Sequence, residues 1–106
     1  MDVSLKLMHD REEAEDDVRV HAWVSADVWR INVAHGMDES EAYGGLLRSL
    51  RATRPRPSWE PDALLHFEQT VRKLVDFVTQ MRAHGRSLER IRVTLARRAG
   101  REVVSY

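Results

Sequence analysis

The side chains best suited to binding chemistry lie in two short charged segments. The first is an acidic run, made of Asp10, Glu12, Glu13, Glu15, Asp16 and Asp17. The second is a basic segment, made of Arg86, Arg90, Arg92, Arg97, Arg98 and Arg101. Arginines bind phosphates and carboxylates through charge-assisted hydrogen bonds, and acidic blocks often dock to basic partners. These residues are therefore the candidate interaction sites.

The charge of the whole chain is divided in the same way, with an acidic first part and a basic second part. The 106 residues carry no net charge, because 17 basic side chains balance 17 acidic ones. Residues 1–41 hold eleven acidic and four basic side chains, which gives −7, and the remainder holds thirteen basic and six acidic ones, which gives +7. Such asymmetry is typical of an interaction surface for nucleic acid, for a charged protein or for a second copy of the chain.

Each charged segment has an ordinary structural interpretation beside the functional one. The acidic run is either a solvated connector or a docking segment for a basic partner, and it lacks the alternating oxygen ligands and central glycine of a calcium loop. The basic segment is a solvated face, a segment paired with the acidic part of the chain, or a phosphate-binding surface. A long helix, a turn and a short basic helix over residues 72–99 have the spacing of the first two helices of many helix-turn-helix domains. This spacing alone identifies no family.

Few features of the sequence indicate catalysis. The chain has no cysteine, and its histidines show neither an HExxH motif nor paired zinc spacing. No nucleophile elbow or phosphate-cradling glycine loop is present. We therefore predict no catalytic residue, no cofactor and no metal. His21, Trp23 and Arg30 are the one set that could line a small-molecule site or stack a base.

Composition predicts one intracellular domain. A chain of this length can bury a single core without disulfides or a structural metal. The N-terminal residues do not resemble a secretory signal, and no apolar run approaches the roughly 18 residues that span a bilayer. We expect a soluble, cytoplasmic protein.

Residues 1–36 predict a three-stranded antiparallel meander. Apolar and polar side chains alternate with a period of two through residues 3–7, 18–24 and 29–33. A hairpin between the second and third segments would place their apolar side chains on one face, as strand register requires. Residues 9–17 would then form an acidic connecting loop. A competing interpretation makes Ser25 the start of a short helix that ends at Gly36.

Helical spacing begins at Asp38, which with Glu41 forms a variant of the capping box. It predicts helices over residues 38–53, 62–84 and 87–99, joined by a proline-rich linker at 54–61 in which Trp59 is expected to contact the core. The long helix packs either in the core or as a dimer seam. A hairpin is the alternative interpretation of the segment that forms the last predicted helix. Residues 101–106 are expected to form an edge strand or a docked tail.

The sequence thus predicts a single α+β domain of order βββααα, with the meander covered on one face by helices. The favoured function is a small non-enzymatic binding or regulatory protein that acts through charged surfaces and protein association, including a homodimer. The alternative is nucleic-acid binding by the basic C-terminal helix.

Overall fold

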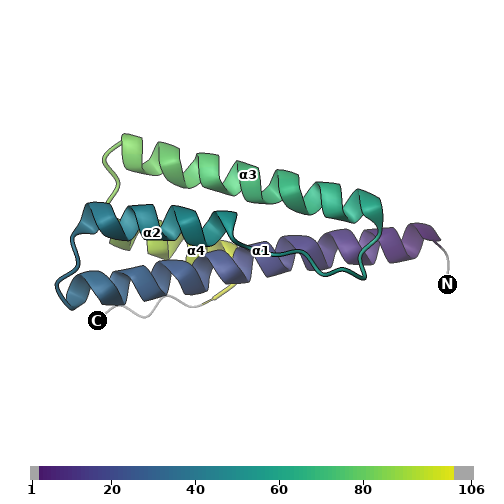
Figure 1. The fold of residues 1–106 in the computed structure, drawn as a ribbon, viewed down its shortest axis with the longest axis horizontal. Coiled ribbons are helices and arrows are strands. Elements are labelled where there is room, and N and C mark those ends of the chain that lie inside the picture. The colour runs from purple at the N-terminus through teal and green to yellow at the C-terminus, as the bar shows by residue number, and fades with distance from the viewer. Residues whose placement is uncertain (1–2, 102–106) are drawn as a thin grey trace.

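Four α-helices make up the fold of residues 3–101, the part of the chain that the computed structural model describes (Figure 1). They are α1 (Val3–Ala34), α2 (Glu39–Arg51), α3 (Pro61–Ala83) and α4 (Leu88–Arg98). Helix α1 is the common partner, because α2, α3 and α4 all pack against it. In Figure 1 α1 and α3 run in the same direction, and α2 and α4 run in the opposite one.

The predicted β-meander is wrong, since residues 3–34 form one uninterrupted helix and the described residues contain no strand. The expected α+β class is therefore corrected to all-helical. The acidic residues 9–17 are part of α1 and not a loop, and the short helix proposed to start at Ser25 is its last third. The expected C-terminal edge strand falls on residues 102–106, which lie outside the described part.

The period-two pattern predicted strands in place of a helix because two different faces of α1 both carry apolar side chains. The buried face follows a spacing of four: Ala14, Val18, Ala22 and Ala26 are all 2% exposed or less. The valines between them, such as Val24 at 47% exposure, lie on another side of the helix. A helix with apolar residues on two sides and a β-strand give the same local alternation over a few residues.

Small side chains on the buried face of α1 allow its neighbours to approach closely. The closest approach is at Gly45 of α2, where an added Cβ would collide with the indole ring of Trp29. Close packing against α1 therefore explains the glycine at this position. The chain leaves α1 through Gly36, whose φ of 104° is a conformation that glycine adopts without strain.

Helices α2 and α4 each begin directly after a residue whose side chain caps the first turn. The Asp38 carboxylate accepts hydrogen bonds from the backbone N–H groups of Ser40 and Glu41, at 3.0 and 3.3 Å, and so begins α2. Ser87 caps α4 by accepting from the N–H of Arg90 at 3.1 Å. Residues 88–98 are therefore helical and do not form the competing hairpin.

Helix α3 lies in the core, as one of its two predicted placements requires. It starts with Pro61, whose fixed φ suits the first helical turn, and buries Phe67, Leu74 and Val78. The described part of the chain contains no helix with both the length and the apolar character needed to cross a membrane.

Candidate functional site

The acidic run contacts the proline-rich linker. Residues 52–60 run back along the N-terminal half of α1 (Figure 1), and Arg56 lies opposite two carboxylates. Its Nε and Nη2 donate to the two oxygens of Asp17 at 2.8 and 2.9 Å, and its Nη1 donates to Glu13 at 2.7 Å. Trp59, which is buried, donates its indole N–H to the same Glu13 oxygen at 3.0 Å. The carboxylates therefore hold the linker in place.

Asp10 fixes the end of the linker at the start of α3. Its buried carboxylate accepts from the Lys6 ammonium at 2.7 Å and from the backbone N–H of Glu60 at 2.9 Å. These two donors, the lysine first, hold the pKa of Asp10 below its ordinary value. Lys6 also donates to the carbonyl of Ser58 at 3.0 Å.

The rest of the acidic run is only partly neutralised. Glu15 lies 2.7 Å from Nε2 of His66 and 3.3 Å from Arg19, and Asp16 lies 3.7 Å from Arg19. Glu12 is exposed and has no side-chain partner among residues 3–101. Within the same range, no ion pair joins the acidic run to the basic segment. The carboxylates of the acidic run that are neutralised within the described residues therefore contact the linker, α1 and α3, and not the basic segment.

Arg92 is a structural residue, although the sequence places it among the interaction candidates. Its side chain is only 8% exposed and lies between two carboxylates. It forms a two-point contact with Glu89, which lowers the pKa of Glu89, and donates to Asp27 of α1 at 3.4 Å. Arg92 thereby links α4 to α1 and is not free for a partner.

The other arginines of the basic segment are exposed, with two different surroundings. Arg98 stacks on Phe77 with its guanidinium carbon 3.8 Å from the ring centre, and Arg101 stacks on Trp23 at 5.2 Å. The side chains of Arg86, Arg90 and Arg97 have no hydrogen-bond or ion-pair partner in the described part of the chain. Arg90 and Arg97 are seven residues apart and so lie on one outward face of α4.

The expected group of His21, Trp23 and Arg30 does not form a site. His21 contacts the backbone carbonyl of Ser49 in α2 through Nε2 at 2.9 Å. Trp23 lies under Arg101, and Arg30 lies 3.9 Å from Asp27. Because the outer sheet face on which this group was predicted does not exist, each residue has its own separate contacts.

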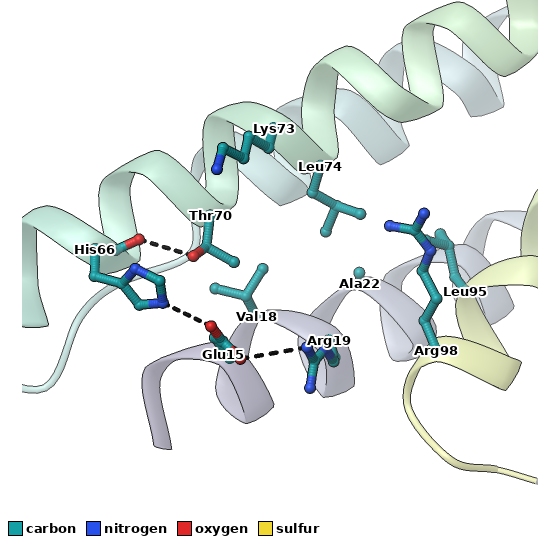
Figure 2. A pocket seen from close by; sticks show the side chains of 10 residues that line it. All are labelled: Glu15, Val18, Arg19, Ala22, His66, Thr70, Lys73, Leu74, Leu95 and Arg98. Atoms are coloured by element: carbon teal, nitrogen blue, oxygen red, sulfur yellow. Dashed lines mark hydrogen bonds and ion pairs between the residues drawn. The ribbon is translucent and has the colours of Figure 1, made fainter. Parts of the chain in front are cut away.

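A cavity of about 240 Å³ lies between α1, α3 and α4, and the sequence did not reveal it (Figure 2). It forms because α3 and α4 both pack on α1 but touch each other little. Its floor consists of the buried side chains Val18, Ala22, Leu74 and Leu95. Its rim consists of Glu15, Arg19, His66, Thr70, Lys73 and Arg98.

One end of this rim is an interlocked polar group. His66 contacts Glu15, which also contacts Arg19, while the Thr70 hydroxyl donates to the carbonyl of His66 at 2.8 Å (Figure 2). The remaining rim cations, Lys73 and Arg98, have no carboxylate partner in the part of the chain that the structure covers. The cavity thus combines an apolar floor with an excess of positive charge.

Comparisons of the chain with protein-family models, with curated proteins and with solved structures find no match. Among residues 3–101, no three His, Asp or Glu side chains gather in a way that could hold a metal ion.

Proposed function

We propose that this protein is a small non-enzymatic binding protein that associates with an acidic protein partner through the outward face of α4. The observation that carries the proposal is an imbalance between its two charged segments. Glu13 and Asp17 are engaged by Arg56 within the chain, whereas the side chains of Arg90 and Arg97 point away from the core without a described partner. Positive charge is therefore what the outward face of α4 offers to a partner.

The number of free arginines favours a protein partner over nucleic acid. Of the six arginines in the basic segment, Arg92 is buried in an ion pair, and Arg98 and Arg101 stack on aromatic rings. The face that is left carries few cations, whereas strongly salt-dependent nucleic-acid binding generally uses about 6–10 phosphate contacts. A few carboxylates of an acidic peptide suffice for Arg90 and Arg97, which bind carboxylates in a two-point geometry. We propose the cytoplasm as the setting, in keeping with a chain that contains no cysteine.

The test is an anisotropy titration at about 50 mM salt, where electrostatic binding is strong. The probes are a fluorescent glutamate-rich peptide and a DNA duplex of equal charge. We expect the peptide to bind more tightly, and the double variant Arg90→Glu, Arg97→Glu to lose that binding. Arg48→Glu with Arg51→Glu is the matched control, since it makes the same charge change on α2. Tighter binding of the duplex would favour the nucleic-acid alternative, and no binding of the peptide would contradict the proposal.

Self-association is a second candidate function, and a different feature favours it. Val24, Val28 and Ile31 of α1 are 46–47% exposed and, with Val20, form an apolar stripe at spacings of four, four and three. In an antiparallel pair, Val24 of one copy would meet Val28 of the other and Val20 would meet Ile31, so the stripe is self-complementary, as a two-fold interface requires.

Light scattering at low and at high salt tests this candidate. An apolar dimer should persist at high salt, and the variant Val28→Lys should be monomeric. Thr94→Lys on α4 adds the same charge away from the stripe and should leave the dimer intact. A wild-type protein that is monomeric throughout the micromolar range would contradict self-association.

A further inference from the structure

The cavity between α1, α3 and α4 differs from the outward face of α4 in having an apolar interior. Ala22 contributes only a methyl group to the floor, which it shares with Val18 of the same helix. Leu74 of α3 and Leu95 of α4 complete the floor. A molecule placed here would lie against an apolar lining below a charged rim, a combination typical of small-molecule sites.

The charges around the cavity select for an anion. Arg19, Lys73 and Arg98 lie on the rim together with a single carboxylate, that of Glu15. Glu15 is engaged by His66 at 2.7 Å and by Arg19 at 3.3 Å, so it does not neutralise Lys73 or Arg98. Figure 2 shows Lys73 projecting from α3 and Arg98 from α4, with Leu74 between them in the view. A negative head group placed between the two side chains would be attracted by both cations.

The volume limits the size of the ligand. The cavity measures about 240 Å³. A dry protein cavity of about 150 Å³ holds a benzene molecule, and the space here therefore accommodates one ring or a short branched chain together with a compact head group.

From the floor, the charges and the volume, we infer that this cavity is a binding site for a small amphipathic anion. The ligand carries a carboxylate or a phosphate that contacts Lys73 and Arg98, and an apolar body that rests on Val18, Ala22, Leu74 and Leu95. This site is independent of the α4 face that carries Arg90 and Arg97.

Four simple compounds test the inference by NMR titration of the ¹⁵N-labelled protein. Phenyl phosphate and benzoate carry both ring and charge, benzyl alcohol lacks the charge, and inorganic phosphate lacks the ring. We expect the first two to shift the amide signals of Ala22, Leu74 and Leu95 saturably, and the last two to bind at least about tenfold more weakly, because each misses one half of the site. The relative affinity of phenyl phosphate and benzoate shows which head group is preferred.

Variants connect that binding to the named residues. Lys73→Met and Arg98→Met should each weaken phenyl phosphate binding by about tenfold, as expected for the loss of one charge-assisted hydrogen bond. Arg72→Met is the matched control, because Arg72 neighbours Lys73 in sequence but lines a different groove, beside the linker. Ala22→Leu should abolish binding by filling the floor, and should it fail to fold, the two rim variants still decide.

Three results would overturn the inference. One is equal binding of phenyl phosphate and benzyl alcohol, which would remove the role of the cations. Another is unchanged binding in both rim variants. The third is a loss of binding in Arg90→Met with Arg97→Met that matches the loss in the rim variants, which would move the anion to the outward face of α4. Loss of acidic-peptide binding in the α4 charge variants, with phenyl phosphate binding unchanged, would separate the two sites.

Discussion

Arg56 and Asp17 form a two-point ion pair that joins the proline-rich linker to the first helix, with N···O distances of 2.8 and 2.9 Å. The two residues are 39 positions apart, and they belong to the acidic first part and the basic second part of the chain respectively. The pair shows that part of the acidic run serves the fold. It also explains how an extended segment with three nearby prolines keeps a fixed path along a helix.

Replacing Arg56 with Gln should loosen the linker. Asp17 and Glu13 would lose their shared cation, and although the arginine side chain is half exposed, it makes three hydrogen bonds at once. We expect a thermal midpoint lower by a few degrees and faster amide exchange in residues 54–60. Arg54→Gln is the control, because Arg54 lies in the same linker without a described ion pair. Equal stability of the two variants would show that the pair does not hold the linker.

The pKa of Asp10 predicts a loss of stability in acid. Lys6 and the N–H of Glu60 lower this pKa in the folded protein, so the folded state binds a proton less readily than the unfolded state. The stabilisation is complete above the unfolded pKa, near 4, and is lost as the pH falls through the lower folded value. Urea unfolding of the wild type and of Asp10→Asn should therefore show a stability difference at neutral pH that shrinks in acid. A difference that stays constant with pH would contradict this assignment.

Adjacent glycines in α2 should respond in opposite ways to alanine. Gly45→Ala would drive a methyl group into the Trp29 ring, and overpacking of this kind costs about 1–3 kcal/mol. At Gly44 the nearest atom is the mobile end of Arg48, at 3.3 Å, so alanine should gain up to about 1 kcal/mol of helix propensity. Denaturant unfolding of the two variants measures the expected loss of stability at Gly45 and the expected gain at Gly44. Destabilisation of similar size at both positions would contradict the role of Trp29.

Arg92 and Arg90 should differ in what they contribute. Arg92→Met leaves Glu89 and Asp27 without their common cation at the contact between α1 and α4, and we expect a cost of about 1–3 kcal/mol in the free energy of unfolding. Arg90→Met should change stability by less than about 0.5 kcal/mol, because its side chain is exposed. Chemical denaturation distinguishes them. A stable Arg92→Met protein would return Arg92 to the set of partner-binding candidates.

The hydroxyl of Tyr43 should lose its proton only at a higher pH than an ordinary tyrosine. Burial, followed by the nearby charge of Glu39, raises the pKa of Tyr43 to about 12, and its hydroxyl donates to the carbonyl of Arg86 at 2.7 Å. The unfolded chain releases this proton near pH 10, so the stabilisation is present below that pH and is lost as the pH rises towards 12. Absorbance titration of a Tyr106→Phe variant, which leaves Tyr43 as the one tyrosine, should show no tyrosinate until the pH exceeds about 11. A transition near 10 in the folded protein would contradict the assignment.

Local capping signals predicted the later helices well, because they depend on a few neighbouring residues. Asp38 begins α2 in the structure as its capping box predicts, and α4 lies within the predicted range 87–99. Helix α1 was misread because its buried positions are small residues such as Ala14 and Ala22, which give a weak apolar signal, while its exposed valines give a strong one. The helix-forming residues Glu12, Glu13 and Ala14 were the overlooked evidence for a helix.

The sequence indicates which kinds of side chain are candidates for binding, but it does not show which of them are exposed or which lie together. The arginines of α4 were recognised as a group, yet only the fold separates buried Arg92 from exposed Arg90. The cavity needs Ala22, Leu74 and Leu95 from three helices, and it exists because α3 and α4 touch each other so little. No local sequence pattern predicts how residues from three separate helices come together.

The central position of α1 has a consequence for how the chain folds during synthesis. This helix leaves the ribosome before α2, α3 and α4, and these three helices, which all pack against it, lie later in the sequence. Its buried face must remain partly uncovered until α2, the linker, α3 and finally α4 have been made, so this fold can be completed only after the synthesis of α4. A shortened chain that lacks α4 would leave Val18 and Ala22 open to water, and we expect such a chain to need a chaperone or to aggregate.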